Sequence, residues 1–149
     1  MELKNEEYSV FFCGISKNCA KTISKNLNFL LDFFNNSSFN SYGIFVDSDS
    51  IDGTKSLLEE FSSDLENVIY EDLDNLDEAY SNRIERIQIS RNRCLEIVSS
   101  INQKQKLIYI PIDLDLDLFK YTTVQSFEDL INYCINKNLP NGIFPFSDP

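Results

Sequence analysis

The sequence predicts an α/β fold with a doubly wound, mostly parallel sheet and flanking helices, in a single domain over residues 1–149. Short runs rich in aromatic and branched residues alternate with segments whose apolar residues recur at helical spacing. Parallel strands are joined by crossover helices of this length, which bury the strands on both faces. With 42% hydrophobic residues, the chain has enough apolar side chains for one core.

Two strand–helix pairs open the chain. Residues 8–15 have the character of a buried strand, and residues 42–46 form the second strand. The helix after each strand carries a stripe of apolar residues at helical spacing, and Asp52 is placed to cap the second helix. The two stripes consist of Ile23, Leu27, Leu30, Leu31 and Phe34, and of Leu57, Leu58 and Phe61.

The alternation continues in the second half of the chain. Residues 67–70 predict a third strand, residues 82–99 a long helix, and residues 106–112 a fourth strand. Pro111 has no amide hydrogen to donate, so we expect it at a sheet edge, at a bulge or at the strand's end.

One more amphipathic helix follows the fourth strand. It opens at Ser126, and residues 140–142 form a turn after it. Its apolar face consists of Phe127, Leu130, Ile131, Cys134 and Ile135.

Charge and cysteine content exclude several classes of function. The net charge of -11 makes nucleic acid an unexpected partner, because an acidic surface repels a polyanion and gains nothing from counterion release. The four cysteines form no CxxC pair and the chain has no histidine, so we expect no ordinary zinc site. No apolar run approaches the length of a membrane span, and the charged start does not resemble a signal sequence. We therefore expect a soluble, cytoplasmic protein.

Polar and acidic residues follow each predicted strand. In open α/β sheets, ligands bind outside the carboxyl ends of the strands, where loops converge and helix amino termini point into the crevice. These residues are therefore expected at one edge of the sheet, which becomes the candidate ligand site. In strand order they are Ser16 and Asn18, Asp47 and Asp49, Glu71 and Asp72, and Asp113, Asp115 and Asp117.

The alternating run of residues 113–117 (DLDLD) has two interpretations. It is either an exposed strand with one apolar and one solvated face, or a metal site. Three like charges in a row on one strand face repel one another, and a hard divalent cation removes that repulsion. Mg²⁺ and Mn²⁺ take oxygen ligands, typically one or two carboxylates together with substrate phosphates. We favour the metal site.

The loop after the second strand also has two roles. Much of residues 47–54 is explained as a strand-to-helix turn, with Gly53 relaxing the backbone. Asp47 is left without a structural reason, and we expect it to accept hydrogen bonds from a base or a ribose.

All the arginines lie on the predicted helix over residues 82–99. Arg86 and Arg93 have an ordinary explanation as exposed partners of the acidic stretch over residues 64–78. Arg91 falls at helical spacing from apolar residues, which predicts a buried guanidinium. A buried guanidinium needs a partner, either a carboxylate at the sheet edge or a diphosphate.

Taken together, these segments resemble the nucleotide-binding half of the GT-A glycosyltransferases, most closely the family-2-like group. Residues 46–54 (VDSDSIDGT) agree with that group's V-D-D-G-S-T-D-G-T segment at six of nine positions. Residues 14–18 lie where the group has its P-x-Y-N loop, with Asn18 as the matching residue. Residues 90–95 (SRNRCL) look like its A-R-N-x-x-L helix, and residues 112–115 (IDLD) look like its metal-binding strand end.

The resemblance implies a metal-dependent transferase that moves a sugar from a UDP- or GDP-linked donor to an acceptor. It implies that Asp47 contacts the base, that Arg91 helps to bind the nucleotide, and that Asp113 and Asp115 hold Mn²⁺ or Mg²⁺ on the diphosphate. The metal would act as a Lewis acid for the departing nucleoside diphosphate. The implied nucleotide-sugar site consists of Ser16, Asn18, Asp47, Asp49, Arg91 and Asp113.

The chain departs from the family's pattern at three points. Ser48 replaces an aspartate and Asp49 replaces a glycine in the second-strand segment, which allows the base contact to shift. Asp117 extends the acidic motif, so Asp115 with Asp117 is an alternative metal pair. Family members continue after the motif with an acceptor site, and we expect this domain to lack a full acceptor-binding part.

Two other functions also use acidic strand ends. A receiver-like signalling domain would hold Mg²⁺ at the same edge without sugar chemistry. A phosphatase would use Asp113 as a nucleophile, although Leu116 and Asp117 stand where that class has threonine or valine.

Overall fold

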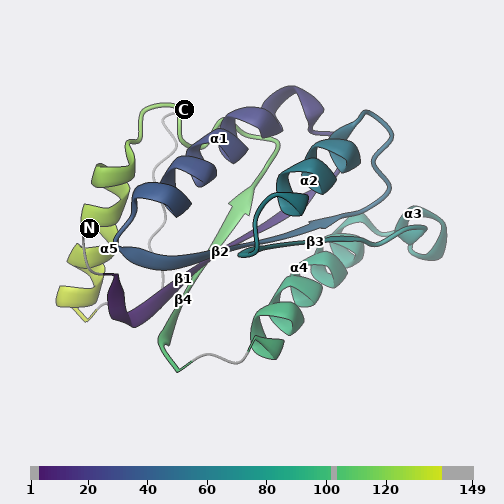
Figure 1. Ribbon diagram of the computed structural model, residues 1–149. Coiled ribbons are helices and arrows are strands. Elements are labelled where there is room, and N and C mark those ends of the chain that lie inside the picture. Colours follow the sequence, from purple (N-terminus) through teal and green to yellow (C-terminus); the bar gives the residue numbers. More distant parts are fainter. Residues whose placement is uncertain (1–3, 102–103, 139–149) are drawn as a thin grey trace.

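The computed structural model describes residues 4–101 and 104–138 and confirms the α/β class (Figure 1). The strands form one all-parallel, four-stranded sheet in the order β3-β2-β1-β4, with helices packed on it as in Rossmann-like folds. The strands are β1 (Asn5–Ser16), β2 (Phe39–Asp47), β3 (Val68–Asp72) and β4 (Lys106–Asp113). The helices are α1 (Ala20–Asn36), α2 (Thr54–Ser63), α3 (Leu76–Ala79), α4 (Arg83–Ser100) and α5 (Val124–Asn136).

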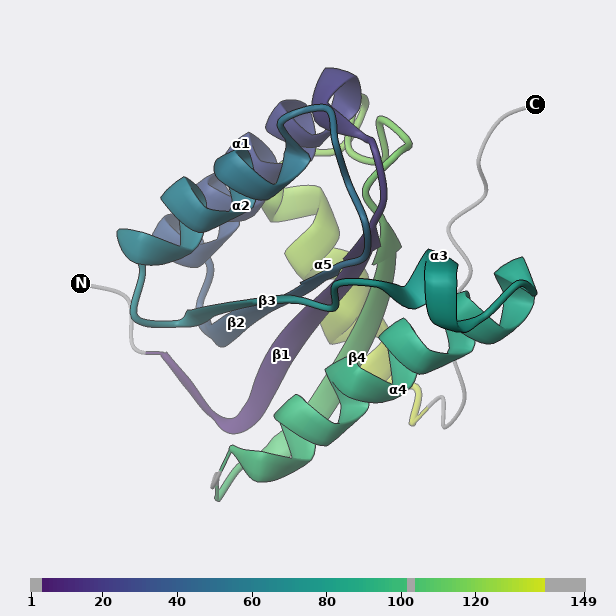
Figure 2. The same ribbon diagram turned by 90° about the vertical axis from the view of Figure 1, so that its right-hand side faces the viewer.

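The helices cover both faces of the sheet, as the doubly wound prediction requires. Helices α1, α2 and α5 pack on one face and α4 packs on the other (Figure 2). Alternate residues of a strand point to opposite faces, so Val10 and Phe12 contact the first layer while Phe11 and Cys13 contact α4. The central strand β1 is therefore buried on both sides.

The order of the strands makes β3 and β4 the edges of this sheet. Pro111 lies in β4 opposite Cys13 of β1 and is exposed. A proline in an edge strand costs no ladder hydrogen bond on the side that has no neighbouring strand. The prediction of an edge position for Pro111 is confirmed.

The ends of several elements differ from the predictions. Both β1 and β2 begin before the predicted residues, because polar residues such as Asn5 and Asn40 gave no strand signal. Helix α5 begins at Val124 and not at Ser126. Its cap is the Thr123 side chain, which accepts from the Ser126 amide, while Ser126 accepts from the Thr123 amide in a capping box.

Helix α3 was not predicted, because four residues are too few to show helical periodicity. The predicted turn at residues 140–142 lies outside the described residues.

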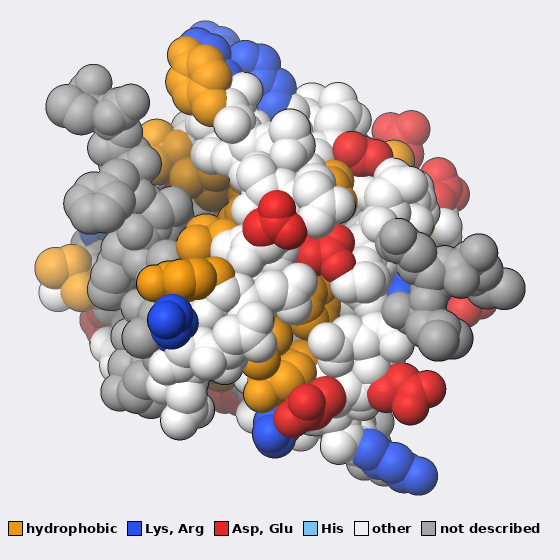
Figure 3. All heavy atoms as spheres, turned by 90° about the vertical axis from the view of Figure 1, so that its left-hand side faces the viewer, with side chains coloured by type: hydrophobic (Ala, Val, Ile, Leu, Met, Phe, Trp, Pro, Cys, Tyr) orange, Lys and Arg blue, Asp and Glu red, His pale blue; other side chains and the backbone are white. Residues whose placement is uncertain are grey.

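The outer surface is mixed in character. The side where α5 lies carries hydrophobic, basic and acidic side chains next to one another (Figure 3). None of the helices within residues 4–101 and 104–138 has the length and apolar character needed to cross a bilayer.

Candidate functional site

The carboxyl ends of the four parallel strands meet at one edge of the sheet. Asp113 ends β4 beside Ile15 of β1, Ser16 ends β1 beside Asp47 of β2, and Asp47 lies beside Asp72 of β3. The predicted convergence of polar strand ends is confirmed. The chain winds outward from β1 to β3 and then crosses to β4 on the other side of β1, so the switch in winding direction lies between β1 and β4.

The acidic run is a turn at the end of β4. Asp113 is the last strand residue, and the Leu116 amide donates to the Asp113 carbonyl at 3.3 Å. Leu114 is fully buried, whereas Leu116 is 51% exposed. The alternative of an exposed strand with an apolar and a solvated face is therefore wrong, because the chain turns after Asp113.

Packing against β1 and α1 holds this turn against the sheet. Leu114 lies over Gly14 of β1, where an added Cβ would come within 2.9 Å of the leucine side chain. The stacked rings of Phe29 and Phe119, 4.0 Å apart, fix the segment after the turn against α1. A side chain at position 14 would therefore force Leu114 to shift from its present position in the core.

Asn26 of α1 is the polar residue that holds the turn, and the sequence analysis missed it. Its amide nitrogen donates to the carbonyls of Leu114 and Leu116 at 3.3 and 2.6 Å, and its oxygen accepts from the Leu118 amide at 3.2 Å. The side chain is fully buried. The available signal was a polar residue within the apolar stripe of α1, between Ile23 and Leu30.

The first and last aspartates of the run have different neighbours. Asp113 lies 3.5 Å from the Arg91 guanidinium of α4, whereas Asp117 lies 3.0 Å from Lys25 of α1, and these helices are on opposite faces of the sheet. Among the described residues, no group of three or more acidic or cysteine side chains is arranged to hold a metal ion. Asp113, Asp115 and Asp117 thus do not form one three-carboxylate site here.

Asp113 and Asp115 nevertheless suit a divalent ion that also binds phosphate. Both are exposed, and such an ion typically uses one or two carboxylates together with substrate oxygens. Asp115 lies close enough to Cys19, the residue before α1, to affect its thiol. The pKa of this thiol is raised to about 11, chiefly by burial, and Asp115 is among the negative charges that contribute to the rise.

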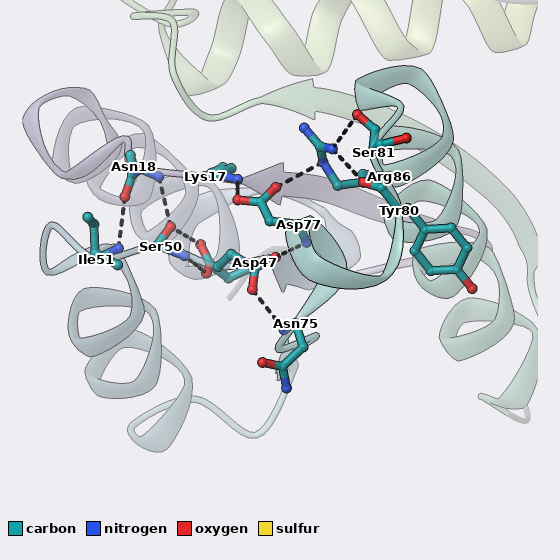
Figure 4. Close-up of polar contacts among 11 residues, drawn as sticks. Lys17, Asn18, Asp47, Ser50, Ile51, Asn75, Asp77, Tyr80, Ser81 and Arg86 are labelled. Carbon is teal, nitrogen blue, oxygen red and sulfur yellow. Dashed lines mark hydrogen bonds and ion pairs between the residues drawn. The ribbon is translucent and has the colours of Figure 1, made fainter.

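Asp47 is a structural carboxylate in this fold, contrary to the prediction that it is free for a base or ribose. It is fully buried. The Ser16 hydroxyl donates to it at 2.6 Å. The Ser50 hydroxyl and amide also donate to it, at 2.6 and 3.2 Å (Figure 4). The Asp47 oxygens that were expected to accept from a nucleotide instead join the loops after β1 and β2.

Asn18 and Asp49 also hold loops. Both have positive φ, of 52° and 58°, which asparagine and aspartate tolerate better than most residues. The Asn18 side chain accepts from the Ile51 amide at 2.8 Å, and Asp49 accepts from the Asn75 and Asp77 amides at 2.7 and 2.9 Å. Their predicted place at the ligand edge is correct, while the contacts they make are within the chain.

Asp52 does not cap α2 in the predicted way. The cap residue of α2 is Gly53, at a φ of 94°. Asp52 instead accepts from the Thr54 hydroxyl and amide at 2.6 and 3.2 Å and from the Ala20 amide of α1 at 3.0 Å. These bonds lower the pKa of Asp52, and the bond from the Thr54 hydroxyl has the largest effect. The amino terminus of α1, where an anion often binds in such folds, already faces a carboxylate.

Arg91 is exposed, and the prediction of a buried guanidinium is wrong. Its side chain is 52% accessible, and the buried stripe of α4 runs instead through Ser90, Cys94, Ile97 and Val98. Ile84, which suggested the wrong stripe, is itself 73% exposed at the start of α4. The expected carboxylate partner at the sheet edge is present in Asp113.

Two further arginines and one lysine pair with the acidic stretch after α2. Arg86 lies 2.9 Å from Asp77, and Arg93 lies 2.7 Å from Glu71, as predicted. Lys55 lies 2.6 Å from both Asp72 and Asp74. Most positive charge near this edge is therefore already matched by a carboxylate.

Two hollows in the surface lie away from the carboxyl edge. One runs along α4 and the other lies near the amino end of β2, and neither collects the strand-end residues. They are lined by Asn92, Leu95, Glu96, Ser99 and Ser100, and by Lys4, Phe34, Asn40, Ser41, Tyr42 and Asn67.

No protein-family model matches this chain, and a search of curated proteins found no significant match to it.

Proposed function

We propose that this chain is a metal-dependent glycosyltransferase domain that binds a nucleotide diphosphate sugar at the carboxyl edge of its sheet. The observation that carries the proposal is the position of Asp113. It ends β4 at the switch between β1 and β4, where open α/β sheets bind ligands, and it is exposed beside Arg91. The resemblance of four segments to the GT-A group gives the ligand its chemical class.

The charge at this edge explains why the proposed ligand needs a cation. The strand ends place the carboxylates of Asp72 and Asp113 at the surface, and the amide of Ala20 at the start of α1 already donates to Asp52. A diphosphate would therefore meet a negative surface. A bound Mg²⁺ or Mn²⁺ would supply the missing positive charge and stabilise the departing nucleoside diphosphate.

The residues at the edge then have separate roles. Asp113 and Asp115 would hold the cation, and Arg91 would turn from Asp113 to a diphosphate oxygen, a ligand that suits its planar fork of donors. Ser16 and Asp47 would position the two loops that flank the nucleotide. In this proposal Asp47 acts on the ligand through the loops and not by direct contact.

A thermal-shift experiment tests the proposal. UDP and GDP are each added with MnCl₂ or MgCl₂, and one nucleotide–metal pair is expected to raise the melting temperature beyond the metal alone. A ligand at about 100 times its Kd stabilises the folded state by about 2.7 kcal/mol, which is easily detected.

Two variants make the test specific. Asp113→Asn is expected to abolish the shift, whereas Asp117→Asn is expected to retain it, because Asp117 pairs with Lys25 on the other side of the turn. Absence of a shift with every nucleotide–metal pair would contradict the proposal, as would an unchanged shift in Asp113→Asn.

A further inference from the structure

Asp77 joins two cations that come from different parts of the chain. Its carboxylate contacts the Lys17 ammonium, from the loop after β1, and lies 2.9 Å from the Arg86 guanidinium of α4 (Figure 4). These contacts lower the pKa of Asp77, and the hydrogen bond from Lys17 has the largest effect. Two cations converging on one carboxylate form the kind of arrangement that also receives a phosphate group.

The segment that carries Asp77 has few attachments of its own. Helix α3 is a single turn in which Leu76 is the one buried residue. The neighbouring residues, from Asn75 to Ser81, are otherwise exposed. Asp49 accepts from the amides of Asn75 and Asp77, so the turn is tied to the edge chiefly by polar contacts. Ion pairs at the surface, such as that of Asp77 with Lys17, are individually weak, at about 0–1 kcal/mol each.

Arg86 has side-chain contacts besides Asp77, and Lys17 has a backbone position set by β1. Arg86 also donates to the carbonyls of Tyr80 and Ser81 at 2.6 and 3.1 Å, and its side chain is only 20% exposed. Lys17 directly follows Ser16, the last residue of β1, so its backbone is fixed at the switch point of the sheet. Removal of the Asp77 charge would leave both cations near the carboxyl edge.

We propose that Lys17 and Arg86 form an anion site for a phosphate group and that the Asp77 carboxylate occupies this site in the free protein. A phosphate-bearing ligand competes with the Asp77 carboxylate for the two cations and takes its place. The residues of this site are distinct from Asp113 and Asp115, which are proposed to hold the metal.

Calorimetric titration with inorganic pyrophosphate, in EDTA and at low salt, tests this inference. Asp77→Asn is expected to bind pyrophosphate up to about fivefold more tightly than the unmodified chain, since a competing ion pair worth up to about 1 kcal/mol is gone. Adding Lys17→Gln or Arg86→Gln to Asp77→Asn is expected to remove this gain in affinity for pyrophosphate. A parallel titration with UDP distinguishes a nucleotide from a free anion as the source of the phosphate.

Asp74→Asn is the matched control. It removes the same charge from the same acidic connection, but Asp74 pairs with Lys55 and not with Lys17 or Arg86. An equal gain in Asp74→Asn would show a general charge effect and overturn the proposal. So would a lower melting temperature in Asp77→Asn without tighter binding, which would make the triad purely structural. Because EDTA is present, a failure here is independent of the metal-dependent proposal for Asp113.

Discussion

The carboxylate of Asp47 has no accessible surface, yet it accepts hydrogen bonds from two hydroxyls and one amide. A buried charge is tolerated only when its hydrogen-bonding capacity is used in this way. Its partners are Ser16, at the carboxyl end of β1, and Ser50, in the loop after β2. One side chain therefore fixes the relative position of two loops.

Replacing this carboxylate should therefore cost stability. Asp47→Ala removes the acceptor and leaves the Ser16 and Ser50 donors without it, and we expect a loss of roughly 2–4 kcal/mol in the free energy of unfolding. Urea denaturation followed by circular dichroism measures the change. Asp115→Ala, at an exposed position, is expected to stay within about 0.5 kcal/mol. Equal effects in the two variants would contradict the structural role of Asp47.

Residue identity alone predicted where these side chains lie but not what they contact. Asp47, Asn18 and Asp49 follow strand ends, which placed them at the carboxyl edge. Their partners are loop amides and hydroxyls brought together by the fold, and no local pattern encodes those. Arg91 was misplaced for a related reason, because Ile84 is apolar but lies at an exposed helix end.

Helix α1 is the element that supports the acidic turn. Asn26 bonds three backbone groups of that turn, and the hydroxyl of Thr22 also donates to the Leu114 carbonyl at 3.0 Å. The position of Asp113 and Asp115 therefore depends on a helix that precedes them by nearly a hundred residues.

Substitution of this asparagine should loosen the turn. Asn26→Ala leaves the Leu116 carbonyl and the Leu118 amide without this partner, while the Leu114 carbonyl keeps the Thr22 hydroxyl. We expect a loss of roughly 2–4 kcal/mol in the free energy of unfolding, together with weaker metal–nucleotide binding. Asn28→Ala on the exposed side of the same helix is the matched control and is expected to change neither quantity. Urea denaturation and the thermal-shift titration measure the two effects. Stability equal to that of the Asn28 variant would refute the supporting role.

At the level of elements, the periodicities predicted each of the long helices and the strands. The periodicities did not predict the start of α5 or the short helix α3, because the local sequence signal there is weak or is shared by two neighbouring residues. Ser126 and Thr123 are both good cap residues within one turn, and the reciprocal bonds of the box decided between them. The α3 turn depends on Asp49, a residue from a loop distant in sequence, so no local pattern could indicate it.

Several exposed carboxylates of the whole molecule have pKa values below their ordinary value of 3.8. A hydrogen bond from the neighbouring threonine hydroxyl is the largest cause for Asp52, and bonds from Lys55 and Lys17 are the largest for Asp74 and Asp77. Such groups stabilise the fold above their unfolded pKa, and this contribution is lost as the pH falls through the folded pKa. Asp72 acts in the opposite direction, because burial raises its pKa.

The melting temperature should consequently fall as the pH is lowered below about 4. Asp52→Asn is expected to melt lower than the unmodified chain at pH 6, and the difference should shrink below the ordinary aspartate value of 3.8. Scanning calorimetry at constant ionic strength measures this difference in melting temperature, at pH values from 2.5 to 7 that are spaced about half a unit apart. A difference that stays constant over the whole range would show that the Asp52 charge makes no such contribution.

The overall architecture was predictable because alternation of strands and helices restricts the topology severely. The burial of β1 on both faces followed from its unbroken apolar run, which matches the observed central position. The order of the strands was not contained in any one segment, since it depends on which crossover helix packs on which face. The candidate site was therefore predictable as an edge of the sheet and not as a set of contacts.

Helix α1 is fixed at two points along its length, at Ala20 by Asp52 from the loop after β2, and at Asn26 to the acidic turn after β4. Six residues separate these points, which corresponds to about 9 Å along a helix axis. A helix resists stretching, so this length acts as a fixed spacer between the loops of β1 and β2 and the aspartates of β4. A ligand that touched both the loops and the aspartates would therefore have to match that spacing.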